Sequence, residues 1–141
     1  MTAAVRLARV SAEPLDVAAH LAAVADPAMG AVTAFVGSVR DADPDAAGPV
    51  VALEYTAHPD AEAVLRRLAE GAGDGVLIAV SHRAGRLGVG EPAVVIAVAS
   101  AHRAAAFAAC RALIESIKAD LPVWKRQVEA DGTTAWKGLG G

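Results

Sequence analysis

The sequence predicts a protein of the α+β class, with a mixed or antiparallel sheet and one long central helix. Residues 100–121 carry apolar side chains every three or four positions, over about six turns, which is typical of a long amphipathic helix. Strand-like and helix-like segments follow in the order βαββαββαββ, without the strict alternation of a doubly wound sheet. An Asp131-Gly132 pair near the C-terminus favours a final β-hairpin.

The first half of the chain divides into a strand, a helix and a second strand. Residues 4–10 alternate apolar and polar side chains and predict a strand. Residues 14–24 have helical spacing and stop before Asp26-Pro27. Residues 30–41 are rich in β-formers, and the sequence DADPDAAGP at 41–49 predicts a loop. This places Arg40 at the end of a strand, beside that loop.

The second half predicts the remaining sheet strands and the two longer helices. Residues 50–55 read as a strand and 59–70 as a helix that ends at the glycine cluster 71–75. Residues 76–81 and 93–99 are apolar enough for central strands, and we expect turns or bulges in the glycine-rich segment 82–92 between them. Residues 123–128 and 133–136 form the final hairpin.

The long helix has a predicted signal at each end. Ser100 is the expected N-cap, since its hydroxyl can accept from the free amides of the first turn. Pro122 prevents the helix from continuing past Leu121. The stripe expected to be buried consists of Phe107, Cys110, Ile114, Ile117 and Leu121.

Length and composition predict one soluble domain spanning residues 1–141. No linker-like segment divides the chain, and its apolar runs fall short of the ~20 residues of a membrane helix. The N-terminus lacks the apolar core of a signal peptide, and the single Cys110 supports no disulfide framework. We therefore expect a cytoplasmic protein without a membrane association.

Charge and histidine spacing exclude two broad functions. The net charge of −3 argues against a general nucleic-acid binder, which needs an excess of basic residues to neutralise phosphates. The four histidines have no metal-ligand spacing, and nucleotide-binding loops and paired cysteine motifs are missing from the sequence, so we expect no metal site. Locally gathered basic residues suit a small anionic ligand instead.

Basic residues gather at the two ends of the long helix. Arg103 and Lys118 are fifteen residues apart, so they lie within roughly 60° of one helix face but about 22 Å apart along the axis. One chain cannot bring both to one small ligand. If both serve one site, we expect a two-fold dimer in which the start of one helix meets the end of its partner.

Each candidate also has a simpler interpretation. Arg40 alone reads as a solvated loop charge, and Lys118 as a helix-surface lysine paired with Glu115. Lys125 alone could solubilise an edge strand. His82 and Arg83, at the end of a strand with no capping context, are interpreted as structural.

Five short motifs in order over ~110 residues resemble the large, catalytic subunit of molybdopterin synthase. They are GSVRD at 37–41, LEY at 53–55, SHRxG at 81–85, SAHRxxAF at 100–107 and IKxxxPxWK at 117–125. The resemblance implies an α/β-hammerhead-type fold and a homodimer of large subunits within a heterotetramer. A small ubiquitin-like sulfur carrier would dock at each end of that dimer.

The same resemblance implies a sulfurtransferase of molybdenum cofactor biosynthesis. Its substrate would be cyclic pyranopterin monophosphate, and the C-terminal glycine thiocarboxylate of the carrier would deliver sulfur twice, with no metal or organic cofactor on the enzyme. It implies Lys118 and Lys125 as catalytic residues. The implied substrate-binding residues are Ser38, Val39, Arg40, His102, Arg103, Arg126 and Gln127.

The C-terminus departs from the family pattern. Some members continue past the last hairpin with a charged segment, whereas this sequence ends in Gly140-Gly141. A terminal Gly-Gly also imitates the tail of the carrier itself, so a second hypothesis is a carrier protein. A third is a catalytically silent anion-binding scaffold, which turnover by Lys118 variants would distinguish from an enzyme.

Overall fold

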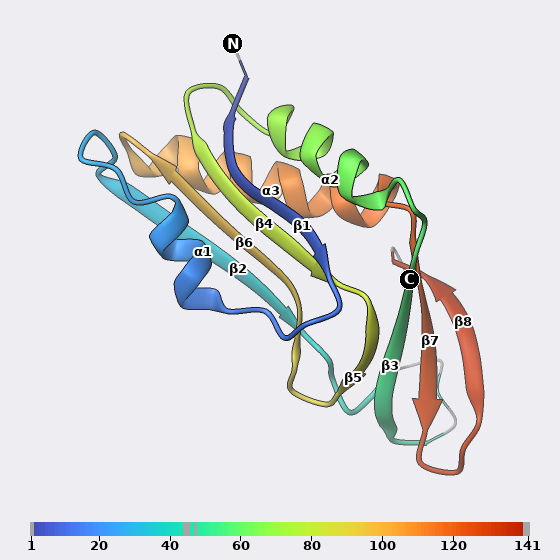
Figure 1. Cartoon of the computed structure of the whole chain (residues 1–141). Helices are drawn as coiled ribbons and strands as arrows, with labels where there is room; N and C mark the ends of the chain where they lie inside the picture. The colour runs from blue at the N-terminus through green and yellow to red at the C-terminus, as the bar shows by residue number, and fades with distance from the viewer. Residues whose placement is uncertain (1, 44–45, 47, 140–141) are drawn as a thin grey trace.

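The computed structural model of the chain contains two four-stranded sheets and three helices, and it describes residues 2–43, 46 and 48–139. The predicted α+β class is confirmed, as is the long helix (Figure 1). The terminal Gly140-Gly141 pair and part of the loop at 41–49 lie outside the described residues.

The first sheet is mixed and forms the larger body of the molecule. Its strands run in the order β1 (Ala4–Ser11), β4 (Leu77–Arg83), β6 (Pro92–Ser100) and β2 (Ala31–Ser38). β1 pairs with β4 in parallel, and the other pairs are antiparallel. Helices α2 (Ala61–Glu70) and α3 (Arg103–Asp120) cover one face, and α1 (Val17–Ala23) lies on the other (Figure 1).

Cover on both faces explains why residues 77–80 of β4 and 93–99 of β6 are continuous apolar runs. Every residue of β4 is buried, and so is every residue of β6 after Pro92. Ile78 and Ile96 belong to the core beneath α2 and α3, while Ala79 and Ala97 belong to the smaller cluster on the α1 side. A strand between two covered faces needs apolar side chains in both directions.

The second sheet is antiparallel and projects from the end of the first. Its strands run in the order β5 (Gly85–Gly88), β3 (Val50–Ala57), β7 (Val123–Glu129) and β8 (Thr134–Gly138). The predicted hairpin is present as β7 and β8, with Gly132 at φ +86° in its turn. The segment predicted as turns or bulges contains β5, which begins at Gly85 with φ +104°.

Helix α3 differs from the predicted helix in its start and in one buried position. It begins at Arg103 with His102 as N-cap, because Ser100 is still the last residue of β6 and donates its hydroxyl proton to the His102 carbonyl. The prediction of Ser100 as N-cap is therefore wrong. Phe107, predicted to be buried, is 61% exposed, whereas Leu113 is fully buried.

The buried face of α3 differs from the predicted one, because alanines occupy part of it. Ala106 and Ala109 are buried, Ala109 beside Gly73 in the connection between α2 and β4, and Leu113 and Ile117 follow with no exposed surface. Alanines permit close approach of helix and sheet, and each fully buried Leu or Ile stabilises the fold by about 1.5–3 kcal/mol. This packing fixes the direction in which the last turn of α3 presents Lys118.

Candidate active site

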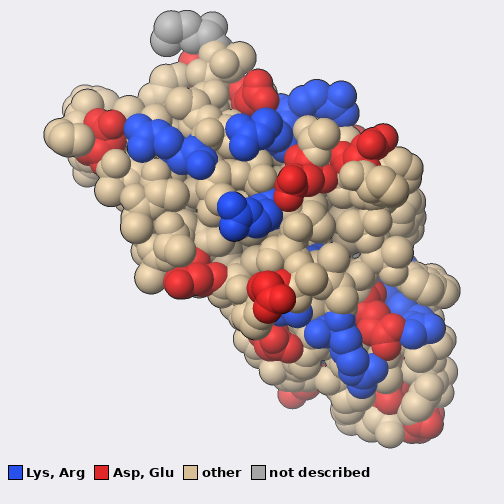
Figure 2. Space-filling view, in the orientation of Figure 1, with Lys and Arg blue, Asp and Glu red and all other residues tan. Residues whose placement is uncertain are grey.

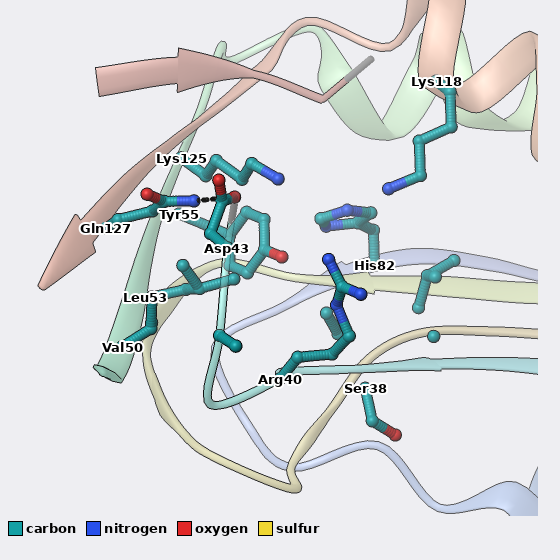
Figure 3. A pocket seen from close by; sticks show the side chains of 14 residues that line it. Ser38, Arg40, Asp43, Val50, Leu53, Tyr55, His82, Lys118, Lys125 and Gln127 are labelled. Carbon is teal, nitrogen blue, oxygen red and sulfur yellow. Dashed lines mark hydrogen bonds between the residues drawn. The ribbon is translucent and has the colours of Figure 1, made fainter. Parts of the chain in front are cut away.

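A pocket of about 240 Å³ lies where the two sheets meet, below the end of α3. The end of β2 and the segment after it form one wall, β3 and β7 form another, and β4, β6 and α3 complete the lining (Figure 3). The lining residues are Gly37, Ser38, Arg40, Ala42, Asp43, Val50, Leu53, Tyr55, His82, Ala93, Val94, Lys118, Lys125 and Gln127.

Three cationic side chains point into this pocket from different elements. Lys118 descends from α3, Lys125 enters from β7, and Arg40 rises from the segment after β2 (Figure 3). Val39 anchors that segment, because its amide donates to the Glu91 carbonyl at 3.0 Å and its carbonyl accepts from Gly90 at 2.8 Å. The buried Val39 thus fixes the strand end from which Arg40 projects.

The surroundings of Lys118 favour loss of its proton. Partial removal of water lowers the pKa of Lys118, and the positive charge of Lys125 lowers it further. Within the part of the chain that the structure describes, no carboxylate contributes to that pKa, so the structure offers no support for pairing with Glu115. An amine of this kind can act as an acid or base more readily than a solvated lysine.

Lys125 lies in a different electrostatic environment. Its half-buried side chain also has a lowered pKa because of desolvation; the carboxylate of Asp43 acts in the opposite direction, whereas the positive charges of Lys137 and Arg40 lower the pKa further. Asp43 accepts a hydrogen bond from Gln127 Nε2, and its Oδ1 lies 3.9 Å from Lys137 Nζ. Lys137 stands opposite Lys125 in the β7–β8 ladder, so both lysines share one face of the second sheet.

His82 and Tyr55 form an uncharged part of the lining. Their rings meet edge to face, with centroids 5.1 Å apart. Burial lowers the pKa of His82 to about 4 and raises the pKa of Tyr55 to about 12. Near neutral pH both rings are uncharged, and the positive charge of the pocket comes from its lysines and Arg40.

The structure separates the neighbouring residues Lys125, Arg126 and Gln127. Successive side chains of a strand point to opposite faces, so Lys125 and Gln127 face the pocket and Arg126 does not. Arg126 instead forms an ion pair with Glu54 directly across the β3–β7 ladder and lies over the Trp136 ring, 5.4 Å from its centroid. Its guanidinium therefore lies outside the pocket.

The other predicted binding residues fall into two groups. Ser38 lines the pocket, whereas Val39 is buried behind it. His102 and Arg103 lie at the start of α3, where both are exposed and neither lines the pocket. Helix α3 is uninterrupted from Arg103 to Asp120, so the Lys118 end of the helix cannot approach these residues within one chain.

Sequence reasoning missed His82, Tyr55 and Asp43 as lining residues. His82 and Tyr55 belong to the motifs SHRxG and LEY, but His82 was interpreted as structural. One signal is present in the sequence: His82 is an ionisable residue just after the apolar run 76–80, where a side chain that becomes buried needs a specific partner. Asp43 lies in a loop whose sequence carries no spacing signal.

Charges elsewhere on the molecule are mixed. On the face shown in Figure 2, lysine and arginine side chains are interspersed with aspartate and glutamate.

Among the described residues, no group of three or more His, Cys, Asp or Glu side chains could hold a metal ion. No helix in the described ranges is long and apolar enough to cross a membrane. The chemistry that this pocket offers is the binding of an anion beside two lysine amines.

Comparison with known proteins gives consistent similarities. The family model described as "MoaE protein" matches residues 10–120. The molybdopterin synthase catalytic subunit 1 of Mycobacterium tuberculosis is 40% identical over 136 residues, which cover 92% of this chain and 89% of the relative.

Solved structures agree with these sequence matches. The crystal structure of molybdopterin synthase from Staphylococcus aureus matches with a TM-score of 0.86 and 31% identity, over 94% of this chain and 97% of that chain. A chain from a complex of subunits 1 and 2 of the Helicobacter pylori molybdopterin-converting factor has a TM-score of 0.64 at 22% identity. This match covers 77% of this chain and 71% of the Helicobacter pylori chain, and at that identity it shows the fold alone.

Proposed function

This chain belongs to the MoaE family, the catalytic subunits of molybdopterin synthase, and we propose that it converts cyclic pyranopterin monophosphate to molybdopterin by sulfur transfer. The sulfur would come from the C-terminal thiocarboxylate of a small ubiquitin-like carrier, delivered twice to make a dithiolene. Because the family match extends over most of the chain, we favour this function over the carrier hypothesis.

The convergence of Arg40, Lys118 and Lys125 on one pocket carries this proposal. A cyclic phosphate is an anion, and a guanidinium holds phosphate oxygens through two parallel hydrogen bonds. The Arg40 guanidinium points inward toward His82 (Figure 3), where it can hold the phosphate while the two lysines face the reacting part of the substrate. Gln127 adds a polar side chain to the same lining, whereas the Ser38 hydroxyl points away from the other labelled side chains (Figure 3).

The two lysines have distinct proposed roles. Lys118, whose pKa is lowered without an opposing carboxylate, exchanges protons with the substrate. Lys125, which lies beside the Asp43 carboxylate, donates hydrogen bonds to the oxyanion that develops as the phosphodiester ring opens and so stabilises it. The assignment rests on the Asp43 carboxylate, which acts on Lys125 and does not act on Lys118.

The proposed assembly is a homodimer with one carrier at each end. The Helicobacter pylori chain of the same fold was solved in a complex of subunits 1 and 2, so this fold is compatible with a bound partner subunit. His102 and Arg103 lie too far along α3 to reach their own pocket, so we propose that they complete the pocket of the partner subunit. We place the reaction in the cytoplasm.

Reconstitution tests this function directly. The purified chain is mixed with thiocarboxylated carrier and the pterin precursor, and molybdopterin is measured as its oxidised fluorescent derivative. We expect product and the release of carrier carrying an ordinary carboxylate. The control uses carrier without thiocarboxylate and should give no product. A folded chain that leaves the precursor unchanged while the thiocarboxylate stays intact would contradict the proposal.

A further inference from the structure

His82 presents a hydrogen-bond acceptor to the pocket. Its Nδ1 lies 2.8 Å from the carbonyl oxygen of Arg83, and because a carbonyl only accepts, Nδ1 carries the ring proton. The ring is 2% exposed, and its burial keeps it neutral near pH 7. A neutral imidazole protonated at Nδ1 has a free lone pair at Nε2. That edge faces away from the Arg83 carbonyl.

Lys118 approaches the same ring from above. Its amine points toward the imidazole in the view of the pocket (Figure 3), and its positive charge contributes to the lowered pKa of His82. The ring itself cannot turn freely, because it is fixed by its bond to the Arg83 carbonyl and by the edge-to-face contact with Tyr55. A flexible amine therefore points toward a rigid imidazole ring.

We propose that His82 is a positioning residue for Lys118, in which Nε2 accepts a hydrogen bond from the Lys118 amine and holds that amine over the pocket. The catalytic consequence rests on the proposed function, whereas the contact itself does not. Holding a reacting group in place is worth a large factor in rate, since a misplacement of about 1 Å can cost ~100-fold.

The absence of charge on His82 distinguishes it from a carboxylate partner. A carboxylate beside Lys118 would raise the pKa of the amine, as Asp43 does for Lys125. A neutral imidazole orients the amine without raising its pKa. The other charged groups facing Lys118 are Lys125 on β7 and Arg40 after β2, both cationic, so an added negative charge would have a clear effect. Asp43 and Lys137 act on Lys125.

Three substitutions at His82 test the inference by kinetics. His82→Gln keeps a neutral acceptor of similar reach, His82→Glu has the same shape with a negative charge, and His82→Leu has no acceptor. We expect His82→Gln to keep kcat within about threefold, and His82→Leu to lower kcat about 10- to 100-fold with KM nearly unchanged. His58→Gln, an exposed histidine outside the pocket, is the matched control and should leave both constants unchanged.

A second measurement needs no substrate. The rate at which a small acylating reagent modifies Lys118 is followed by mass spectrometry of the peptide as a function of pH. We expect His82→Glu to shift the midpoint for Lys118 to higher pH than in His82→Gln, with circular dichroism showing that both are folded. The exposed Arg111 supplies a neighbouring control, since Arg111→Lys introduces a solvated lysine on α3 whose midpoint should not change with residue 82.

The outcomes separate this inference from the proposed function. If the midpoint of Lys118 is the same in His82→Gln and His82→Glu, the contact does not exist and the inference is overturned. It is likewise overturned if a folded His82→Leu variant keeps full kcat. If His82→Leu does not fold, the comparison of the Lys118 midpoint between His82→Gln and His82→Glu still tests the inference. A chain that makes no molybdopterin but shows the shift refutes the function and supports the contact.

Discussion

Lys118 and Lys125 enter one pocket from opposite sides of the Leu121-Pro122 turn, the first from the last turn of α3 and the second from β7. The amide of Val123 donates to the Leu121 carbonyl at 2.8 Å, so the turn between the two elements is tight. Pro122 ends the helix and directs the chain into the second sheet. The helix end and the strand start thereby bring two amines, separated by seven positions, to the same ligand.

Lys118→Ala should abolish molybdopterin formation without unfolding the protein. Its exposed side chain contributes within ~0.5 kcal/mol to the free energy of unfolding, whereas loss of a general acid or base lowers kcat by about 100-fold or more. Turnover and chemical denaturation measure the two effects. Arg111→Ala, on an exposed position of the same helix, is the control and should keep full activity. Near-normal turnover by folded Lys118→Ala would remove this lysine from the mechanism.

Arg40→Ala should weaken binding of the phosphate-bearing precursor more than it slows the reaction at saturation. A contact made equally in the ground state and the transition state affects KM and leaves kcat nearly unchanged. We expect KM to rise about 10-fold or more, as for loss of a charge-assisted hydrogen bond. Arg86→Ala is the control, because Arg86 is exposed and pairs with Glu54 outside the pocket. A fall in kcat at unchanged KM would instead assign Arg40 to the transition state.

Asp43→Asn should shift the pH dependence of catalysis to lower pH. The Asp43 carboxylate raises the pKa of Lys125, so its neutralisation lowers that pKa, and Lys125 then loses its proton at a lower pH. The alkaline limb of the pH profile of kcat/KM should therefore also move to lower pH. At neutral pH the KM for the anionic precursor should fall, because the pocket gains net positive charge.

Asp41→Asn is the matched control for that shift. It removes the same charge two residues away, from an exposed side chain that does not line the pocket. The alkaline limb of Asp41→Asn should coincide with that of the unmodified protein. An unchanged limb in Asp43→Asn, or an equal shift in both variants, would show that Asp43 does not act on Lys125.

The sequence predicted most elements because local signals and burial agree in this chain. The apolar runs in β4 and β6 predict buried strands, and the Asp-Gly pair predicts the hairpin turn, each from local sequence alone. The buried face of α3 was predicted with an error because Phe107 is apolar yet exposed, while alanines carry the contact. The short strand β5 was missed because its pairing with β3 is a long-range interaction.

The pocket was harder to predict than the fold. The alternation of β7 already implies that Lys125 and Gln127 share a face which Arg126 cannot share, so that separation was readable in the sequence. By contrast, nothing local brings His82 of β4 beneath Lys118 of α3. That proximity follows from the packing of α3 across the first sheet, with Leu113 and Ile117 buried against it.

The last prediction concerns a site shared between subunits. Arg103 begins α3 and Lys118 lies in its last turn, about 22 Å apart along an unbroken helix. Extended side chains of roughly 6 Å at each end still leave a gap too wide for one pterin phosphate. We therefore expect each active site to take Lys118 and Lys125 from one subunit and His102 and Arg103 from the other.

Subunit exchange tests this arrangement. Inactive Arg103→Ala and Lys118→Ala homodimers are mixed under conditions that exchange subunits. A mixed dimer contains one site with both residues intact and one site that lacks both. With equal amounts and random exchange, half of the dimers are mixed, so activity should return to about a quarter of the unmodified level. If one chain supplied all residues of its own site, every site in the mixed dimer would carry one lesion and the mixture would stay inactive. Mass spectrometry of differently tagged subunits verifies the exchange, and an inactive mixture despite complete exchange would refute the shared site.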